Sequence, residues 1–121
     1  MMASMAGIVV RVGGTLGFVP ASVARRLSRQ PTVSRVPGSA LGMTLVDGHV
    51  VPVLELGTEP DTLICELEGE PLALSGVQGI RSGCFEAEDG GVLLDGTLVR
   101  PLDLVGLVGE TEQALRQRRS P

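Results

Sequence analysis

The residue types that carry acid–base, nucleophilic or metal chemistry are scarce in this chain of 121 residues and lie far apart in its sequence. It contains one histidine (His49), no lysine and two cysteines (Cys65 and Cys84). Without lysine, the chain has neither a Schiff-base amine nor a phosphate-binding loop of the Gly-x-x-x-x-Gly-Lys type. One histidine and two unrelated cysteines do not supply the three or four ligands of a usual zinc site. The sequence therefore predicts no metal and no cofactor.

The remaining candidates for catalysis have simpler structural explanations. His49 directly follows an Asp-Gly pair at 47–48, which is typical of an exposed hairpin residue rather than of a catalytic base. The acidic residues within 86–89 are typical of a solvated loop. The glycine-rich stretch at 13–17 belongs to a predicted hairpin and does not open a helix, so it is not expected to bind phosphate. We therefore expect no enzyme.

Charge is distributed unevenly along the chain. Residues 1–54 have a net charge of +4, residues 55–91 of −8 and residues 92–121 of zero, which gives −4 overall. A dipolar surface of this kind favours an oriented protein partner over a polyanion. The chain has two Phe and neither Trp nor Tyr, so it lacks aromatic platforms on which single-stranded bases could stack. We expect protein partners and no nucleic acid.

Cysteine use and hydrophobicity favour a reduced, cytoplasmic protein without direct membrane insertion. Cys65 lies in a predicted buried strand and Cys84 in a predicted loop, and two cysteines do not make a disulfide framework. Residues 1–6 lack the basic start of a secretory signal. No run reaches the roughly 18 apolar residues of a membrane-spanning helix.

The elements that would position a binding surface occur twice in the chain. Asp-Gly pairs at 47–48 and 95–96 each lie between two apolar runs, which is a strong short-range signal for a β-hairpin. Each pair is preceded by another predicted hairpin, with turns at 13–14 and 68–69. Pro52 interrupts a returning strand and predicts an edge, a bulge or a change of sheet there. This repeated order predicts two all-β halves that share one core.

Further segments follow from local patterns. A short helix is expected over 21–27, because Pro20 suits a first helical turn and Val23 and Leu27 lie four residues apart. The predicted strands lie near 7–12, 15–19, 32–36, 41–46, 49–56, 62–67, 71–74, 77–80, 92–94 and 97–100. The expected connections are a tight connector at 57–61, a glycine- and acid-rich loop over 81–91, and a C-terminal helix after Pro101 that breaks near Gly109 and restarts at Thr111 before a frayed tail.

This organisation favours binding as the function. Two β halves that meet along a seam provide an apolar groove, and strands interrupted by proline leave edges that can accept a partner. A cluster of arginines beside the predicted helix either steers an acidic partner or forms a solvated face, and both interpretations stay open. The members of this cluster are Arg25, Arg26, Arg29 and Arg35.

The order of several weak motifs over residues 7–108 is more specific than any one of them. In the first half these are a hairpin over 9–19, the segment 21–27, Pro37 followed by Gly42, the Asp-Gly turn at 47–48, and Val-Pro-Val-Leu-Glu-Leu at 51–56. In the second half they are Leu63-Ile64, Val77 with Ile80, and Leu102-Asp103-Leu104. In this order the sequence resembles the CheW-like coupling domains of bacterial chemosensory systems.

The resemblance implies a mainly β fold of two intertwined five-stranded SH3-like barrels that share a core, with the second barrel incomplete. The domain would cover 7–108, with halves near 7–56 and 62–104, and a C-terminal helix and frayed tail would follow over 109–121. It implies a non-catalytic adaptor that binds the helical-hairpin tip of a methyl-accepting chemoreceptor and the regulatory domain of a histidine kinase. By position, the receptor-binding residues would be Val23, Gly42, Leu63, Ile64 and Ile80, with Arg25 and Arg26 as electrostatic contacts.

The sequence also departs from the family pattern. Asp47-Gly48 replaces the usual Arg-Gly turn, so a cationic contact is lost. The segments at 57–61 and 81–91 are short where the family has a longer loop and an additional strand. We therefore hypothesise that receptor binding is retained and kinase coupling is weak or absent. The alternatives are an SH3-like structural or protein-interaction subunit unrelated to chemotaxis and, last, an enzyme that uses His49.

Overall fold

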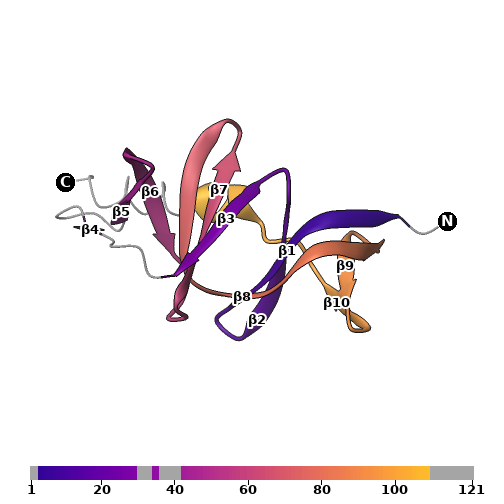
Figure 1. Ribbon diagram of the computed structural model, residues 1–121. Helices are drawn as coiled ribbons and strands as arrows, with labels where there is room; N and C mark the ends of the chain where they lie inside the picture. The colour runs from indigo at the N-terminus through magenta and orange to yellow at the C-terminus, as the bar shows by residue number, and fades with distance from the viewer. Residues whose placement is uncertain (1–2, 30–33, 36–41, 110–121) are drawn as a thin grey trace.

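The computed structural model describes residues 3–29, 34–35 and 42–109 (Figure 1). The described chain is mainly β, as predicted, and its strands form one ten-stranded sheet. A short helix follows at 104–109. The strands are β1 (Ser4–Val12), β2 (Thr15–Pro20), β3 (Ala24–Arg29), β4 (Ser34–Arg35), β5 (Gly42–Val46), β6 (His49–Glu55), β7 (Asp61–Leu67), β8 (Glu70–Glu88), β9 (Gly91–Leu94) and β10 (Thr97–Val99).

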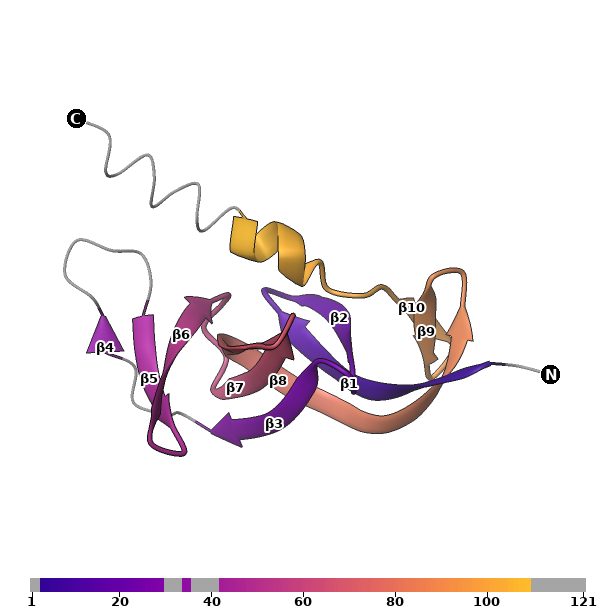
Figure 2. The same cartoon turned by 90° about the horizontal axis from the view of Figure 1, so that it is seen from above.

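Strand β8 is 19 residues long and belongs to both parts of the sheet. Its first half pairs with β7 in the antiparallel sense and with β6 in the parallel sense. On the far sides of these strands, β3 adds to β7, while β5 and β4 add to β6. The second half of β8 pairs with β1, which in turn pairs with β2, and its end pairs with β9. The two parts therefore lie on either side of the middle of β8 (Figure 2).

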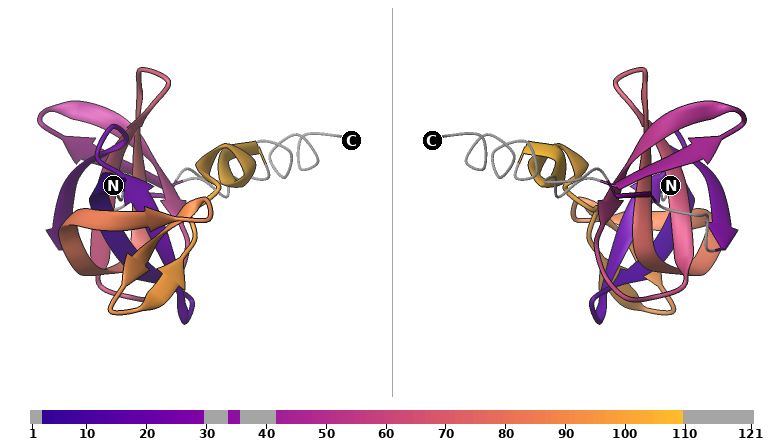
Figure 3. Two further views of the ribbon diagram at one scale, coloured as in Figure 1. Left: turned by 90° about the vertical axis from the view of Figure 1, so that its right-hand side faces the viewer. Right: turned by 90° about the vertical axis from the view of Figure 1, so that its left-hand side faces the viewer.

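The chain beyond β10 returns to β2. The backbone N–H of Phe18 donates to the carbonyl of Arg100 at 2.9 Å, and the N–H of Leu102 donates to the carbonyl of Phe18 at 2.9 Å. These bonds curl the β1, β2, β9 and β10 part of the sheet on itself (Figure 3). The closed SH3-like barrels that the resemblance implies stay a prediction.

Buried side chains form three clusters that follow this division. One cluster surrounds the edge-to-face pair Phe18 and Phe85, whose ring centroids lie 5.8 Å apart. A second lies inside the curve of β6, β7 and β8, around Val53. The largest, central cluster draws Val10, Leu74 and Leu104 from both halves of the sequence and from the helix. Residues from both halves thus share a core, as expected.

The predicted hairpin turns are confirmed. At 13–14, 47–48, 68–69 and 95–96, both central residues have positive φ, which Gly, Asp and Asn tolerate best. Pro52 lies where β6 is paired with β5 alone, and pairing of β6 with β8 begins at Val53. The missing N–H of the proline therefore removes no bond from the central sheet.

The helix expected over 21–27 is wrong. The N–H of Val23 donates to the carbonyl of Pro20 at 2.9 Å and closes a turn, after which the chain continues as β3. β3 pairs with β7 from Ala24 to Arg29, with a register shift between Ala24 and Arg26. Pairing with a buried neighbouring strand has overridden the helical spacing, since local propensity is a weaker determinant than tertiary contact.

The loop expected over 81–91 is also wrong. The strands predicted near 71–74 and 77–80 are one strand, and this strand continues to Glu88 because β1 and β9 pair with it. Most side chains of 81–84 are exposed, which gave this stretch the polar composition of a loop. The real turn comprises Asp89 and Gly90, both with positive φ.

The strand predicted at 32–36 and the C-terminal helix predicted after Pro101 agree in part with the structure. β4 lies within the strand predicted at 32–36, whose other residues are outside the described chain. Helical spacing from Leu104 is confirmed over 104–109, where Asp103 caps the helix by accepting a 3.0 Å hydrogen bond from the N–H of Gly106. The expected break, restart and tail at 110–121 lie outside the described residues. No helix in the described part of the chain is long and apolar enough to cross a membrane.

We predict that Gly76→Ala destabilises the fold by more than about 2 kcal/mol. Gly76 has a φ of +75°, and an added Cβ would meet the backbone of Gly57 in the connector. Urea denaturation measures the loss. Gly69→Ala is the matched control, because Gly69 has a φ of +81° and nothing lies near its added Cβ, so about 1 kcal/mol is expected. Equal losses in the two variants would contradict the prediction.

Candidate binding groove between β3 and β1

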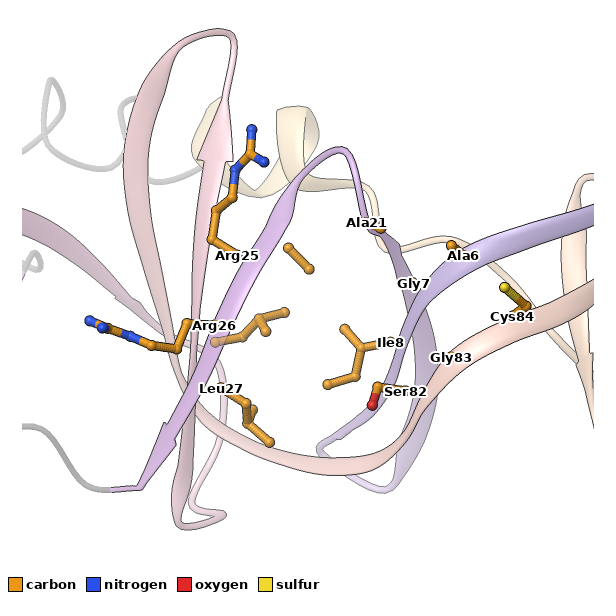
Figure 4. Close-up of a pocket in the computed structure, with 12 residues that line it drawn as sticks. Ala6, Gly7, Ile8, Ala21, Arg25, Arg26, Leu27, Ser82, Gly83 and Cys84 are labelled. Atoms are coloured by element: carbon orange, nitrogen blue, oxygen red, sulfur yellow. The ribbon is translucent and has the colours of Figure 1, made fainter.

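A groove of about 480 Å³ lies between β3 on one side and the paired strands β1 and β8 on the other (Figure 4). β3 pairs with β7 alone, so the groove runs along its other edge. The groove is thus a gap between the two parts of the sheet. It is lined by Ala6, Gly7, Ile8, Ala21, Ala24, Arg25, Arg26, Leu27, Leu63, Ser82, Gly83 and Cys84.

The floor and walls of the groove are mainly apolar. Ile8 and Leu63 are buried members of the central cluster, and each also lines the groove. Leu27 of β3 is 40% exposed and extends toward β8 (Figure 4). Alanine and glycine make up much of the remaining lining, so few side chains fill the space. Such a surface favours an apolar ligand whose own side chains protrude and can fill the groove.

Arg25 and Arg26 form the rim of the groove, and both guanidinium groups point away from its middle (Figure 4). Arg25 Nε lies 3.2 Å from a carboxylate oxygen of Glu66, and Arg26 Nη1 lies 3.6 Å from one of Asp47. Both arginine side chains are 53% exposed. Exposed ion pairs of this kind contribute about 0–1 kcal/mol, so an incoming carboxylate can replace the internal one at little cost.

The structure brings three of the sequence-predicted residues to the groove. These are Leu63, Arg25 and Arg26. Val23 lies immediately before β3, where it is half-buried against the central cluster. Receptor contact by these residues stays a prediction.

The other predicted residues lie elsewhere. Ile64 packs in the separate cluster around Val53, because successive side chains of a strand point to opposite faces and Leu63 occupies the groove side. Ile80 is half-buried against the cluster around Phe85. Gly42 is buried in β5, where it pairs with β4 and β6. None of these three lines the groove.

Sequence reasoning missed Ile8, Leu27 and the stretch Ser82 to Cys84 as lining residues. Leu27 was assigned to a helix and the stretch at 82–84 to a loop, and both errors concealed the groove. An apolar leucine flanked by Arg25, Arg26 and Arg29 was the one signal that could have indicated a surface with a binding role.

Other chemistry is absent from this part of the molecule. His49 is exposed at the start of β6, as predicted, and does not line the groove. Among the described residues, no three His, Cys, Asp or Glu side chains group in a way that could hold a metal ion. The groove therefore combines a concave apolar surface with a basic rim, and both are features of a binding site.

The fold is similar to that of a known scaffold. A solved structure, the scaffolding protein TtCheW from Thermoanaerobacter tengcongensis, matches with a TM-score of 0.62 and 14% sequence identity. The match covers 85% of this chain and 92% of the other. No protein-family model matches the sequence, and no curated protein matches it. The two proteins thus share a fold.

The two cysteines provide a test of this geometry. Cys84 is exposed in the groove, whereas Cys65 is buried in β7 and burial raises its pKa to about 12. Because the thiolate is the reactive form, we predict that a thiol reagent at about pH 8 modifies one cysteine per native chain. Spectrophotometric thiol counting measures this, and Cys84→Ser should abolish the reaction. Two thiols that react at similar rates in the native protein would contradict the structure.

Proposed function

We propose that this protein is a non-catalytic, cytoplasmic adaptor of a bacterial chemosensory system and binds the helical-hairpin tip of a chemoreceptor in the groove along β3. The observation that carries this proposal is the apolar groove with its basic rim. The fold that the chain shares with a CheW scaffolding protein supports the choice of partner. The resemblance of the sequence motifs to the same family also supports it.

The groove suits one face of a helix. An α-helix with its side chains is about 10–12 Å across, and apolar residues spaced three and four apart form a ridge along one side. A volume of about 480 Å³ accepts several side chains of such a ridge while the helix itself stays outside. At about 25 cal/mol per Å² of apolar surface, one contact gives modest affinity, so an array would depend on many contacts at once.

The rim adds orientation to this contact. Arg25 and Arg26 lie at the rim beside carboxylates of the same chain, and both side chains are half exposed, so an acidic group on a partner can approach them. An acidic residue on the partner helix exchanges with Glu66 or Asp47 and directs the helix along β3. The contact weakens as salt is added, since exposed charges are screened.

Kinase coupling is the weaker half of the proposed role. Where the family has a longer loop and an additional strand, β8 is joined to β9 by the turn at Asp89 and Gly90. The sheet ends there with β10, which has three residues. We infer that the two curled parts are SH3-like barrels and that the part formed by β1, β2, the second half of β8, β9 and β10 offers a reduced surface to a kinase regulatory domain.

A competing function is that of a structural or protein-interaction subunit of SH3-like architecture unrelated to chemotaxis. It uses the same groove for another partner. Binding to receptor tips separates the two functions.

We predict that Ser82→Arg weakens binding of a receptor tip by about tenfold or more, because a long charged side chain would occupy the apolar groove. Ser82 is exposed on the wall of the groove, so the fold should tolerate the change. Co-sedimentation with receptor signalling tips measures the affinity. Thr97→Arg is the control, since Thr97 is exposed on β10 outside the groove. Equal binding by both variants would exclude this groove as the receptor site.

A second experiment addresses the kinase. In a pull-down, we expect the regulatory domain of the histidine kinase to be retained far less than the receptor tip, because the sheet edge at β10 is short. The isolated receptor tip serves as the positive control. Tight retention of the kinase domain would refute weakened coupling and leave the receptor proposal standing.

A further inference from the structure

Leu27, which lines the groove, packs against Gly79 of β8. Leu27 extends from β3 toward β8, and a Cβ added to Gly79 of β8 would collide with Leu27 Cδ2. The Cδ1 and Cγ atoms of Leu27 lie 3.6 Å from the same point. Leu27 therefore contacts β8 at a place that is open only because residue 79 has no side chain.

The backbone of Gly79 gives no other reason for a glycine. The φ angle of Gly79 is not positive, so the backbone conformation at this position also suits alanine. Glycine inside a strand is unfavourable, because it loses more conformational freedom than other residues on folding, and it often marks a close approach of another group. Here the approaching group is Leu27.

Gly79 is held at the place where β8 changes partners. Pairing of β8 with β7 ends at Val77, and pairing with β1 begins at Gln78. The register with β1 then shifts, so that Ile80 has no partner. The N–H of Gly79 donates to Asp61 Oδ2 at 2.9 Å.

Asp61 links this point to β3. The residue is 6% exposed, and its second oxygen, Oδ1, lies 3.6 Å from Arg29 Nε. Arg29 is the last residue of β3, two positions after Leu27. The same carboxylate therefore contacts both Gly79 and the end of β3, and moving Gly79 away from Leu27 would break the part-buried hydrogen bond to Asp61.

We propose that Gly79 is a positioning residue of the groove: its missing side chain lets Leu27 lie against β8, and this contact sets the shape of the groove that a partner helix meets. This inference rests on the proposed receptor-binding function. A larger residue at position 79 displaces Leu27, whose side chain is 40% exposed, and leaves the rest of the fold in place. The glycine and the leucine act as one unit.

A double-mutant cycle tests whether Gly79 and Leu27 act together. We expect Gly79→Ala to weaken binding of the receptor tip by about tenfold, and we expect the same change in a Leu27→Ala background to alter binding by less than about twofold, since the colliding side chain is gone. Gly69→Ala, at an open turn, is the control for loss of a glycine and should leave binding unchanged. Equal effects of Gly79→Ala in both backgrounds, or no effect in either, would overturn the proposal.

A second measurement needs no receptor. Methyl NMR of the unmodified chain should show a nuclear Overhauser contact between a Leu27 methyl group and the Hα atoms of Gly79. In Gly79→Ala that methyl should lose its contacts with β8 while the urea midpoint falls only slightly. If the unmodified chain binds no receptor tip, the proposed function fails, yet the NMR result still decides the role of Gly79. An unmoved Leu27 would overturn the inference even if receptor binding is strong.

Discussion

The exchange of partners along β8 is the constraint on which the rest of this structure depends. A single strand of 19 residues pairs with β6 and β7 in its first half and with β1 and β9 in its second. Two glycines mark the crossing. Gly76 lets the connector at residue 57 pass against the strand, and Gly79 donates its N–H to Asp61 and accepts Leu27 on its open face. Because both halves of the sheet include β8, the backbone hydrogen bonds of this one strand join them.

The groove is a consequence of this arrangement. β7 stays with the first half of β8 and carries β3 with it, while β1 follows the second half, so β3 and β1 diverge and leave a gap between them (Figure 4). The central cluster forms the floor of that gap through Ile8 and Leu63. A partner that enters the groove therefore touches both halves, and the shape it meets is set by contacts such as that between Leu27 and Gly79.

The errors of the sequence prediction share a cause. The segment 21–27 has helical spacing and the segment 81–91 has a loop-like composition. Residues 24–29 and 81–88 are nevertheless strands, because neighbouring strands need their backbone hydrogen bonds. For the site, the resemblance led to Leu63, Arg25 and Arg26, which line the groove, and to Ile64, Ile80 and Gly42, which do not. Adjacent strand residues face opposite sides, so Leu63 and Ile64 could not both lie in one groove.

The sequence by itself determined the β class, the positions of the hairpin turns and the shared apolar core. These depend on local chemistry: positive φ at Asp-Gly and Gly-Gly pairs, and alternating aliphatic residues that must be buried. Only the tertiary structure decided that β8 is one strand, that β3 joins β8 through β7, and that Leu27 packs against Gly79. Those features depend on which distant backbone groups pair, and pairing over long sequence separations is settled by the packing of the whole chain rather than by any stretch of it.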